Sequence, residues 1–121
     1  MTIPKRGEIW LVNLDPTIGA EIKKTRPTIV ISSDFVGKLP LKLVVPLTDW
    51  KNSFANNLWH VRIEPNTTNG IAKVSAADIL QTRSLDRQRF VRKLGTASID
   101  NLQEITIAMA GVIELVPYQD I

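Results

Sequence analysis

Cysteine is absent from the 121-residue chain, and histidine occurs once, at His60. Without thiols there can be no disulfide framework, no thiolate nucleophile and no zinc–thiolate site, and a single imidazole leaves few metal geometries open. No apolar run approaches the roughly 20 residues that a membrane span needs, and the start, MTIPKRGEIW, lacks the apolar core of a secretory signal. We therefore expect no metal, no cofactor and no membrane association, and a cytoplasmic location.

The residues that are present fit one globular domain spanning 1–121. Hydrophobic residues make up 44% of the chain and charged residues 22%, close to average globular usage. A chain of this length buries a single core and is too short for two independent ones. One fold must therefore carry the whole function.

The charge is distributed unevenly along the chain. All 15 Lys and Arg lie at or before Lys93, so that residues 1–93 carry a net charge of +7 and residues 94–121 a net charge of −4. The basic part is where a phosphate backbone would bind. The charge distribution fits equally well with basic residues that only keep the protein surface soluble. The sequence motifs are therefore needed to choose between this interpretation and nucleic-acid binding.

Short strands are predicted over the first three quarters of the chain. Residues 58–63 alternate strictly, with Leu58, His60 and Arg62 on one face, and residues 17–27 and 50–57 form polar loops. Pro46 predicts an edge position or a bulge. Residues 76–89 combine a helical turn with a charged run. The predicted strands cover residues 8–14, 28–32, 41–47, 58–63, 71–75 and 90–96.

The end of the chain is different, because apolar residues recur there at steps of three and four. Ser98 can cap a helix, and acidic residues at 100 and 104 suit its first turns. A helix over residues 99–115, closed by Pro117, is predicted. Its apolar face is formed by Leu102, Ile105, Met109, Val112 and Ile113. Several short strands and one helix predict a mainly β (α+β) fold, a small barrel with the helix packed against it.

Several short motifs occur in one order along the chain: Arg6-Gly7-Glu8, Asp15-Pro16, Gly19-Ala20-Glu21, Arg26-Pro27, Pro46-Leu47-Thr48 and the run from Gln81 to Asp86. Together these motifs resemble the MazF/PemK family of toxins. This resemblance implies an SH3-like barrel of the CcdB–MazF type that forms a homodimer. It also implies a sequence-specific, metal-independent endoribonuclease, an mRNA interferase of a type II toxin–antitoxin system.

The resemblance also implies partners. Family members cut single-stranded RNA by attack of a 2′-hydroxyl on the scissile phosphate, and a cognate antitoxin inhibits them by laying an acidic, disordered tail in the RNA groove. In complex with the antitoxin such toxins also take part in DNA binding. An acidic tail suits the +7 segment of this chain.

Three residues are predicted to carry the chemistry. Arg26 offers a planar fork of donors that matches phosphate oxygens, and we expect it to stabilise the doubly charged phosphorane. Thr48 gives a hydroxyl hydrogen bond to the same phosphate, as its counterpart is thought to do in the family. Glu21 is the carboxylate best placed for proton transfer or for orienting Arg26.

Further residues are predicted to bind RNA. Trp50 and Phe54 can stack on bases, although aromatic residues in loops also pack at the edge of the core or in a dimer interface. Asp86 can pair with one of the arginines, Arg83, and His60 is expected at a surface or interface rather than in catalysis. Gln81 is assigned to RNA through the family motif. The residues expected to contact phosphate are Lys23, Lys24, Arg83 and Arg87.

The chain departs from the family at three places, and two other functions stay open. Lys23 and Lys24 stand where members often have glycines, Leu80 stands where some have an acidic residue, and no histidine lies near Glu21.

The same fold in CcdB-like toxins binds a protein target such as DNA gyrase, but residues 116–121 lack the Trp-Gly-Ile-like end of CcdB. An inactive RNA-binding member is the third possibility.

Overall fold

The computed structural model describes residues 3–116. It contains seven strands and one α-helix, with four single-turn 3₁₀ helices between them. The strands are β1 (Glu8–Asn13), β2 (Thr25–Val30), β3 (Leu41–Asp49), β4 (His60–Ile63), β5 (Ser75–Asp78), β6 (Arg83–Asp86) and β7 (Phe90–Thr96). The helices are α1 (Ile99–Val112), η1 (Asp34–Val36), η2 (Asn52–Phe54), η3 (Ile79–Gln81) and η4 (Arg87–Arg89).

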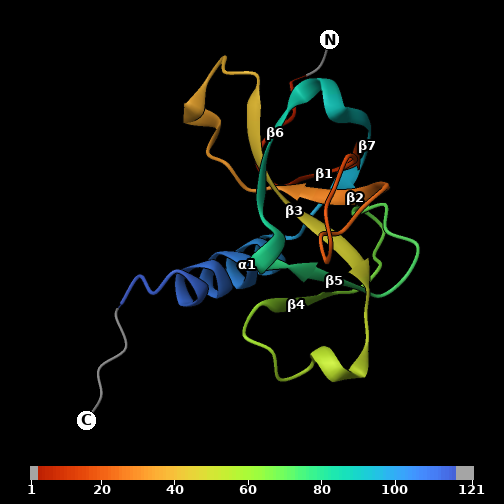
Figure 1. Ribbon diagram of the computed structural model, residues 1–121, viewed down its shortest axis with the longest axis vertical. Coiled ribbons are helices and arrows are strands. Elements are labelled where there is room, and N and C mark those ends of the chain that lie inside the picture. The colour runs from red at the N-terminus through yellow and green to blue at the C-terminus, as the bar shows by residue number, and fades with distance from the viewer. Residues whose placement is uncertain (1–2, 117–121) are drawn as a thin grey trace.

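The strands form an antiparallel sheet in the order β4-β5-β3-β2-β1-β7, with β6 paired to the first half of β3 (Figure 1). The expected mainly β fold with a C-terminal helix is confirmed. Within residues 3–116, however, β4 and β7 do not pair, so the sheet stays open instead of closing into a barrel. Pro46 lies between the part of β3 that pairs with β6 and the part that pairs with β5. Its missing N–H therefore falls at an interruption of the ladder, not at a true edge.

The strand β6 was missed, because residues 83–86 lie in the segment expected to combine a helical turn with a charged run. Two further predicted segments are corrected by the structure. The loop expected over 17–27 ends earlier, because β2 begins at Thr25 and places Arg26 opposite Val12 of β1. The strand expected over 71–75 is wrong, since residues 72 and 73 form a bend and the strand there, β5, begins only at Ser75. The small apolar pair at 76–77 hid β5 from the pattern of hydrophobic residues. Both errors arise where pairing with a neighbouring strand, not local sequence, sets the boundary.

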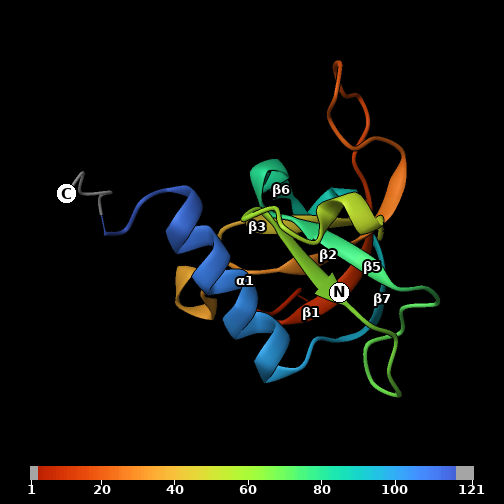
Figure 2. The same ribbon diagram turned by 90° about the horizontal axis from the view of Figure 1, so that it is seen from below.

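Alternate residues of the strands pack on two sides of the sheet. On one side a large cluster lies under α1, which packs against β4 and η3 (Figures 1 and 2). We call this side the helix-covered face; its strand residues are Ile9, Ile29, Val45, Leu47, Val61, Ile63 and Ala77. A smaller cluster lies on the opposite side, formed by Trp10, Val12, Leu14, Val30, Val44 and Leu85.

The helix agrees with its prediction except at its end. The Ser98 side chain accepts a hydrogen bond from the Asn101 N–H at 3.0 Å, as a cap does. Ile105 is buried and Leu102 packs against the core, but Ile113 is exposed. The helix ends at Val112, so Ile113 lies in the turn that follows and leaves the apolar stripe. Pro117, the predicted stop, lies outside the described residues.

Candidate functional site

Strand register brings two of the three predicted catalytic residues together. Thr28 of β2 lies opposite Pro46 of β3, and the same register continued by two residues places Arg26 opposite Thr48. Directly opposed residues of an antiparallel pair point to the same face of the sheet. We call this side, opposite to the helix-covered face, the site face.

Arg26 and Thr48 both line a pocket of about 160 Å³ where β2 begins and where β3 ends. Lys73 and Asp49 line it as well. The Arg26 Nε donates to the Lys23 carbonyl at 3.3 Å, which fixes one edge of the guanidinium. The pocket therefore combines a positioned guanidinium, a hydroxyl and an ammonium, which are the donors that recognise a phosphodiester, with the single carboxylate of Asp49.

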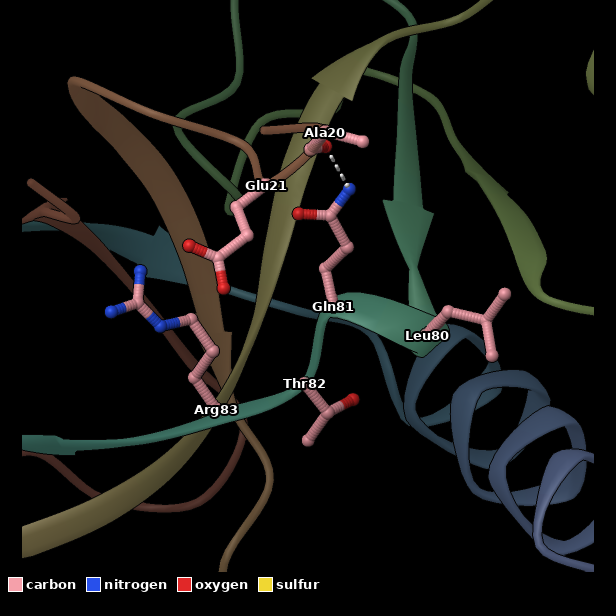
Figure 3. A pocket seen from close by; sticks show the side chains of 6 residues that line it. All are labelled: Ala20, Glu21, Leu80, Gln81, Thr82 and Arg83. Atoms are coloured by element: carbon pink, nitrogen blue, oxygen red, sulfur yellow. Dashed lines mark hydrogen bonds between the residues drawn. The ribbon is translucent and has the colours of Figure 1, made fainter. Parts of the chain in front are cut away.

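Glu21 lies in a second pocket, of about 340 Å³ (Figure 3). Its carboxylate and the Arg83 guanidinium point toward each other there. The Glu21 Oε1 also accepts from the Ile18 N–H at 2.7 Å. Arg83 faces Val44 of β3, four residues before Thr48 and thus about 13 Å along the strand. The structure therefore places Glu21 beside Arg83 and not in the pocket of Arg26, so its catalytic role stays a prediction.

Gln81 anchors the β1–β2 connection over the site face. Its side chain accepts from the Ile22 N–H and donates to the Ala20 carbonyl at 3.1 Å (Figure 3). Leu80 next to it is 59% exposed and points away from Glu21. In this structure Gln81 thus shapes the second pocket, whose outer wall is the connection that projects from the body in Figure 2.

Of the four predicted phosphate ligands, three lie near the two pockets. Arg83 donates to the Leu14 carbonyl at 2.9 Å. The Arg83–Asp86 ion pair is wrong among the described residues, because Asp86 instead accepts from the Gln88 N–H at 2.8 Å. Lys23 and Lys24 are exposed on the β1–β2 connection. Arg87 follows β6 where Asp86 faces Leu41, at the opposite end of β3 from Thr48, so it reaches neither pocket.

Lys24 has a φ of +71°, the left-handed region that glycine adopts readily. A glycine is what the family resemblance led us to expect at this turn. The chain therefore keeps the backbone shape of the connection while it replaces glycine with a cation.

The predicted stacking aromatics have partners within the chain. The Trp50 and Phe54 rings meet edge to face at 5.9 Å, and Phe54 stacks on His60 at 3.8 Å and 13°. The Arg62 guanidinium lies over the Trp50 ring, 5.4 Å from its centroid. Trp50 therefore presents an indole already paired with a cation, an arrangement that single-strand binding surfaces use.

His60 is not a surface residue, because its side chain is only 6% exposed. Its Nε2 lies 3.6 Å from Asp78 and its Nδ1 lies 3.1 Å from the Asn57 amide. The expected surface position is therefore wrong, and an interface position is untested. Sequence reasoning missed Asp78 and Arg62, although the alternation of residues 58–63 placed Arg62 and His60 on one face.

Across residues 3–116, no three His, Asp or Glu side chains are grouped as ligands of a metal ion. In the same part of the chain, no helix is both long enough and apolar enough to cross a bilayer.

The fold and the first pocket define a class of small, single-helix β proteins with a cationic pocket at the strand ends. A family model described as PemK-like, MazF-like toxin of type II toxin-antitoxin system matches residues 5–113. The chain belongs to this family.

Known proteins of this family are similar to the chain in sequence or in fold over most of its length. It is 32% identical, over 87% of its length and 92% of the relative's, to the endoribonuclease MazF9 of Mycobacterium tuberculosis (strain ATCC 25618 / H37Rv). The crystal structure of MazF from Deinococcus radiodurans superposes with a TM-score of 0.78 at 25% identity, covering 94% of this chain and 99% of that one. A mycobacterial endoribonuclease in complex with its cognate antitoxin shares the fold, with a TM-score of 0.74 at 15% identity, covering 97% and 100% of the two chains.

Proposed function

We propose that the protein is the toxin of a type II toxin–antitoxin system, an mRNA interferase that cuts single-stranded RNA at a short motif without a metal. The observation that carries this proposal is that Arg26 and Thr48 line one pocket, as the register of Thr28 opposite Pro46 leads one to expect when it is continued by two residues. A relative 32% identical to the chain is named an endoribonuclease. The chain is proposed to be one domain, residues 1–121, that acts in the cytoplasm as a homodimer with its site shared across the twofold axis.

In the proposed reaction a ribose 2′-hydroxyl gives its proton to a base and its oxygen bonds to the adjacent phosphorus, while the bond from phosphorus to the 5′-oxygen breaks and that oxygen takes up a proton from the protonated base or from water. Negative charge grows on the phosphoryl oxygens as the phosphorane forms. The Arg26 guanidinium, held through the Lys23 carbonyl, donates to these oxygens, and the Thr48 hydroxyl gives a further hydrogen bond. Preorganised donors of this kind contribute about 3 to 4 kcal/mol to transition-state stabilisation.

Proton transfer is assigned to Glu21 with less support from the geometry. Glu21 lines the neighbouring pocket with Arg83, not the pocket of Arg26. In this position it reaches the reacting ribose only if RNA draws the β1–β2 connection toward Thr48. A carboxylate there would accept the 2′-hydroxyl proton or position Arg26.

RNA is proposed to cross the site face of a homodimer, where Lys23, Lys24, Arg83 and Gln81 contact the strand. Trp50 and Phe54 contribute base stacking, while the position of Arg87 gives its role little support. A cognate antitoxin with an acidic, disordered tail competes for the same basic surface, and a related mycobacterial endoribonuclease is known in complex with its antitoxin. A disordered acidic tail that becomes ordered on binding would complement the charge of residues 1–93, which is +7.

A CcdB-like toxin that binds gyrase is less well supported, because that role needs no phosphate pocket. The C-terminal residues 117–121, on which part of this comparison depended, lie outside the described residues. An inactive RNA-binding member is separated from the proposed enzyme by the assay that follows.

The test is incubation with a long unstructured RNA in excess EDTA, with the fragments mapped by sequencing. We expect discrete cuts at a recurring motif, a loss of hundreds-fold in rate for Arg26→Ala, and an unchanged rate for the matched variant Arg92→Ala on β7. Intact RNA with the wild-type protein contradicts the proposal. Cleavage that survives Arg26→Ala assigns the activity to other residues or to a contaminant.

A further inference from the structure

A row of side chains extends the site across the sheet to β4. Thr48 lies opposite Ala76 of β5, and Ala76 lies opposite Arg62 of β4. Because directly opposed residues share a face, Arg26, Thr48, Ala76 and Arg62 form one row on the site face. The four strands that carry the row, β2, β3, β5 and β4, are neighbours in Figure 1.

The geometry points to Arg62 and Trp50 as a second nucleotide subsite, in which Arg62 binds an RNA phosphate other than the scissile one and Trp50 provides a base-stacking surface. This inference rests on the proposed function, since it names a further contact for the same RNA. Three strand spacings separate β2 from β4, or about 14 Å. That exceeds the distance between neighbouring phosphates of one strand, so Arg26 and Arg62 meet different phosphates.

The immediate surroundings of Arg62 favour anion binding. Its guanidinium lies over the Trp50 ring at 5.4 Å, which limits the orientations of the donor fork before any ligand arrives. The Trp50 backbone is fixed by its N–H bond to the Val74 carbonyl at 3.2 Å. A preorganised cation loses less side-chain entropy on binding a phosphate than a free one does.

The contact that holds Arg62 in this structure is easily exchanged. Its Nη2 lies 3.3 Å from the Glu64 carboxylate, with the two side chains 50% and 68% exposed. An ion pair this exposed contributes about 0 to 1 kcal/mol. A phosphate can therefore replace Glu64 at little cost, and Glu64 is a weak competitor that lowers RNA affinity.

An acidic protein segment is the other class of ligand that a guanidinium accepts. RNA is favoured because the subsite pairs a guanidinium with an indole, which matches the phosphate and the base of a nucleotide. The subsite at Arg62 also lies in one row with Arg26 and Thr48, so an RNA strand bound at one of these positions is directed toward the other.

The test is fluorescence anisotropy with a labelled, fully 2′-O-methylated RNA containing the mapped cut motif, titrated at several salt concentrations. The methyl groups remove the nucleophile, so binding is measured without cleavage. For Arg62→Gln we expect affinity to fall about tenfold or more. The slope of log affinity against log salt should become shallower by about 0.7, the value for one lost contact to a single strand.

Three further variants sharpen the result. Glu64→Gln should raise affinity up to about fivefold, because the competing carboxylate is gone. Arg62→Lys should keep the salt slope but lose part of the affinity, because the ammonium lacks the planar fork. Arg92→Gln, which removes the same charge from β7 at the far edge of the sheet, should change neither quantity. Unchanged thermal unfolding shows that each variant is folded.

The outcomes separate this inference from the proposed function. Wild-type cleavage in EDTA together with unchanged RNA binding by Arg62→Gln overturns the inference and leaves the enzyme intact. If the wild-type protein cleaves nothing, the proposed function fails, and anisotropy with an unstructured RNA still decides whether Arg62 binds phosphate. If Arg62→Gln loses affinity for a labelled poly-glutamate peptide while RNA affinity is retained, the surface belongs to an acidic protein and the inference is wrong.

Discussion

The two faces of the sheet are made by alternate residues of the same strands, yet they differ in what they contact. Ile29, Val45 and Leu47 point to the helix-covered face and pack with Ile105 of α1. On the site face, the same two strands also carry Arg26 and Thr48, which line a pocket beside the smaller apolar cluster. The period of two in a β-strand therefore lets one short segment serve both stability and chemistry.

This division predicts that substitutions on the two faces have separable effects. A change under α1 should lower the free energy of unfolding and leave the reacting groups in place. A change at Arg26 or Thr48, the polar residues of the site face, should alter RNA cleavage and leave stability nearly unchanged, because both are only partly buried and lie outside the smaller apolar cluster of that face. The predictions below test this division, from the largest expected effect to the smallest.

Ile105→Ala should lower the free energy of unfolding by about 2 to 5 kcal/mol, because Ile105 is buried in the cluster under α1. The matched control is Ile107→Ala. Ile107 lies two residues further along the same helix, and its side chain is 71% exposed. That variant should change stability by less than about 0.5 kcal/mol. Urea denaturation of both variants gives the comparison, and equal losses would contradict the assignment of the helix face.

Thr48→Val should slow RNA cleavage about 10- to 100-fold, because a hydrogen bond to a charged phosphate is worth about 1.5 to 3 kcal/mol. The isosteric valine fills the same space, so the unfolding temperature should hardly change. Thr25→Val on β2 provides the control, since residue 25 alternates with Arg26 and points away from the site face. Equal rates for wild type and Thr48→Val would remove Thr48 from the mechanism.

Lys24→Gly tests the connection that covers part of the site face. Lys24 has a φ of +71°, where a Cβ atom costs about 1 kcal/mol or more. The glycine variant should therefore be about 1 kcal/mol more stable than Lys24→Ala, which loses the same charge but keeps the strain. Thermal unfolding of the pair measures the difference. If alanine and glycine are equivalent here, the backbone conformation is different from the one described.

Glu8→Gln should have the smallest effect, at the start of β1 and away from both pockets. Partial burial raises the pKa of Glu8, but hydrogen bonds from the Lys5 N–H and the Trp10 indole, together with the Lys93 ammonium at 3.0 Å, hold it below its ordinary value. A lowered pKa in the folded state stabilises the protein above the unfolded value near 4.5.

This stabilisation is lost as the pH falls through the folded pKa. Glu8→Gln should therefore unfold at a slightly lower temperature than wild type at pH 7, and the gap should narrow as the pH falls below the unfolded value of 4.5 and through the lower folded pKa. A gap that persists unchanged at pH 3 would show that hydrogen-bond geometry, not charge, makes the difference. Differential scanning calorimetry at several pH values distinguishes the two.

Much of the fold follows from local patterns in the sequence. The alternation of residues 58–63, the span of β7 and the Ser98-capped start of α1 all agree with the structure. These elements have a strong hydrophobic period or a specific cap, and both act over a few residues. The segments that failed, residues 71–75 and the start of β2, have weak local signals, and pairing with β3 and β1 sets their limits.

For the site, the sequence determined the chemistry of the residues, and the tertiary structure decided which of them meet. Arg26 and Thr48 were expected in one place from the family motifs, and strand register brings them together across 22 positions of sequence. Glu21 lies five residues from Arg26 yet lines another pocket, because Gln81 ties its loop down on η3. The subsite at Arg62 also depends on register. Cross-strand neighbours are set by pairing between distant segments, and no local pattern of residues encodes that pairing.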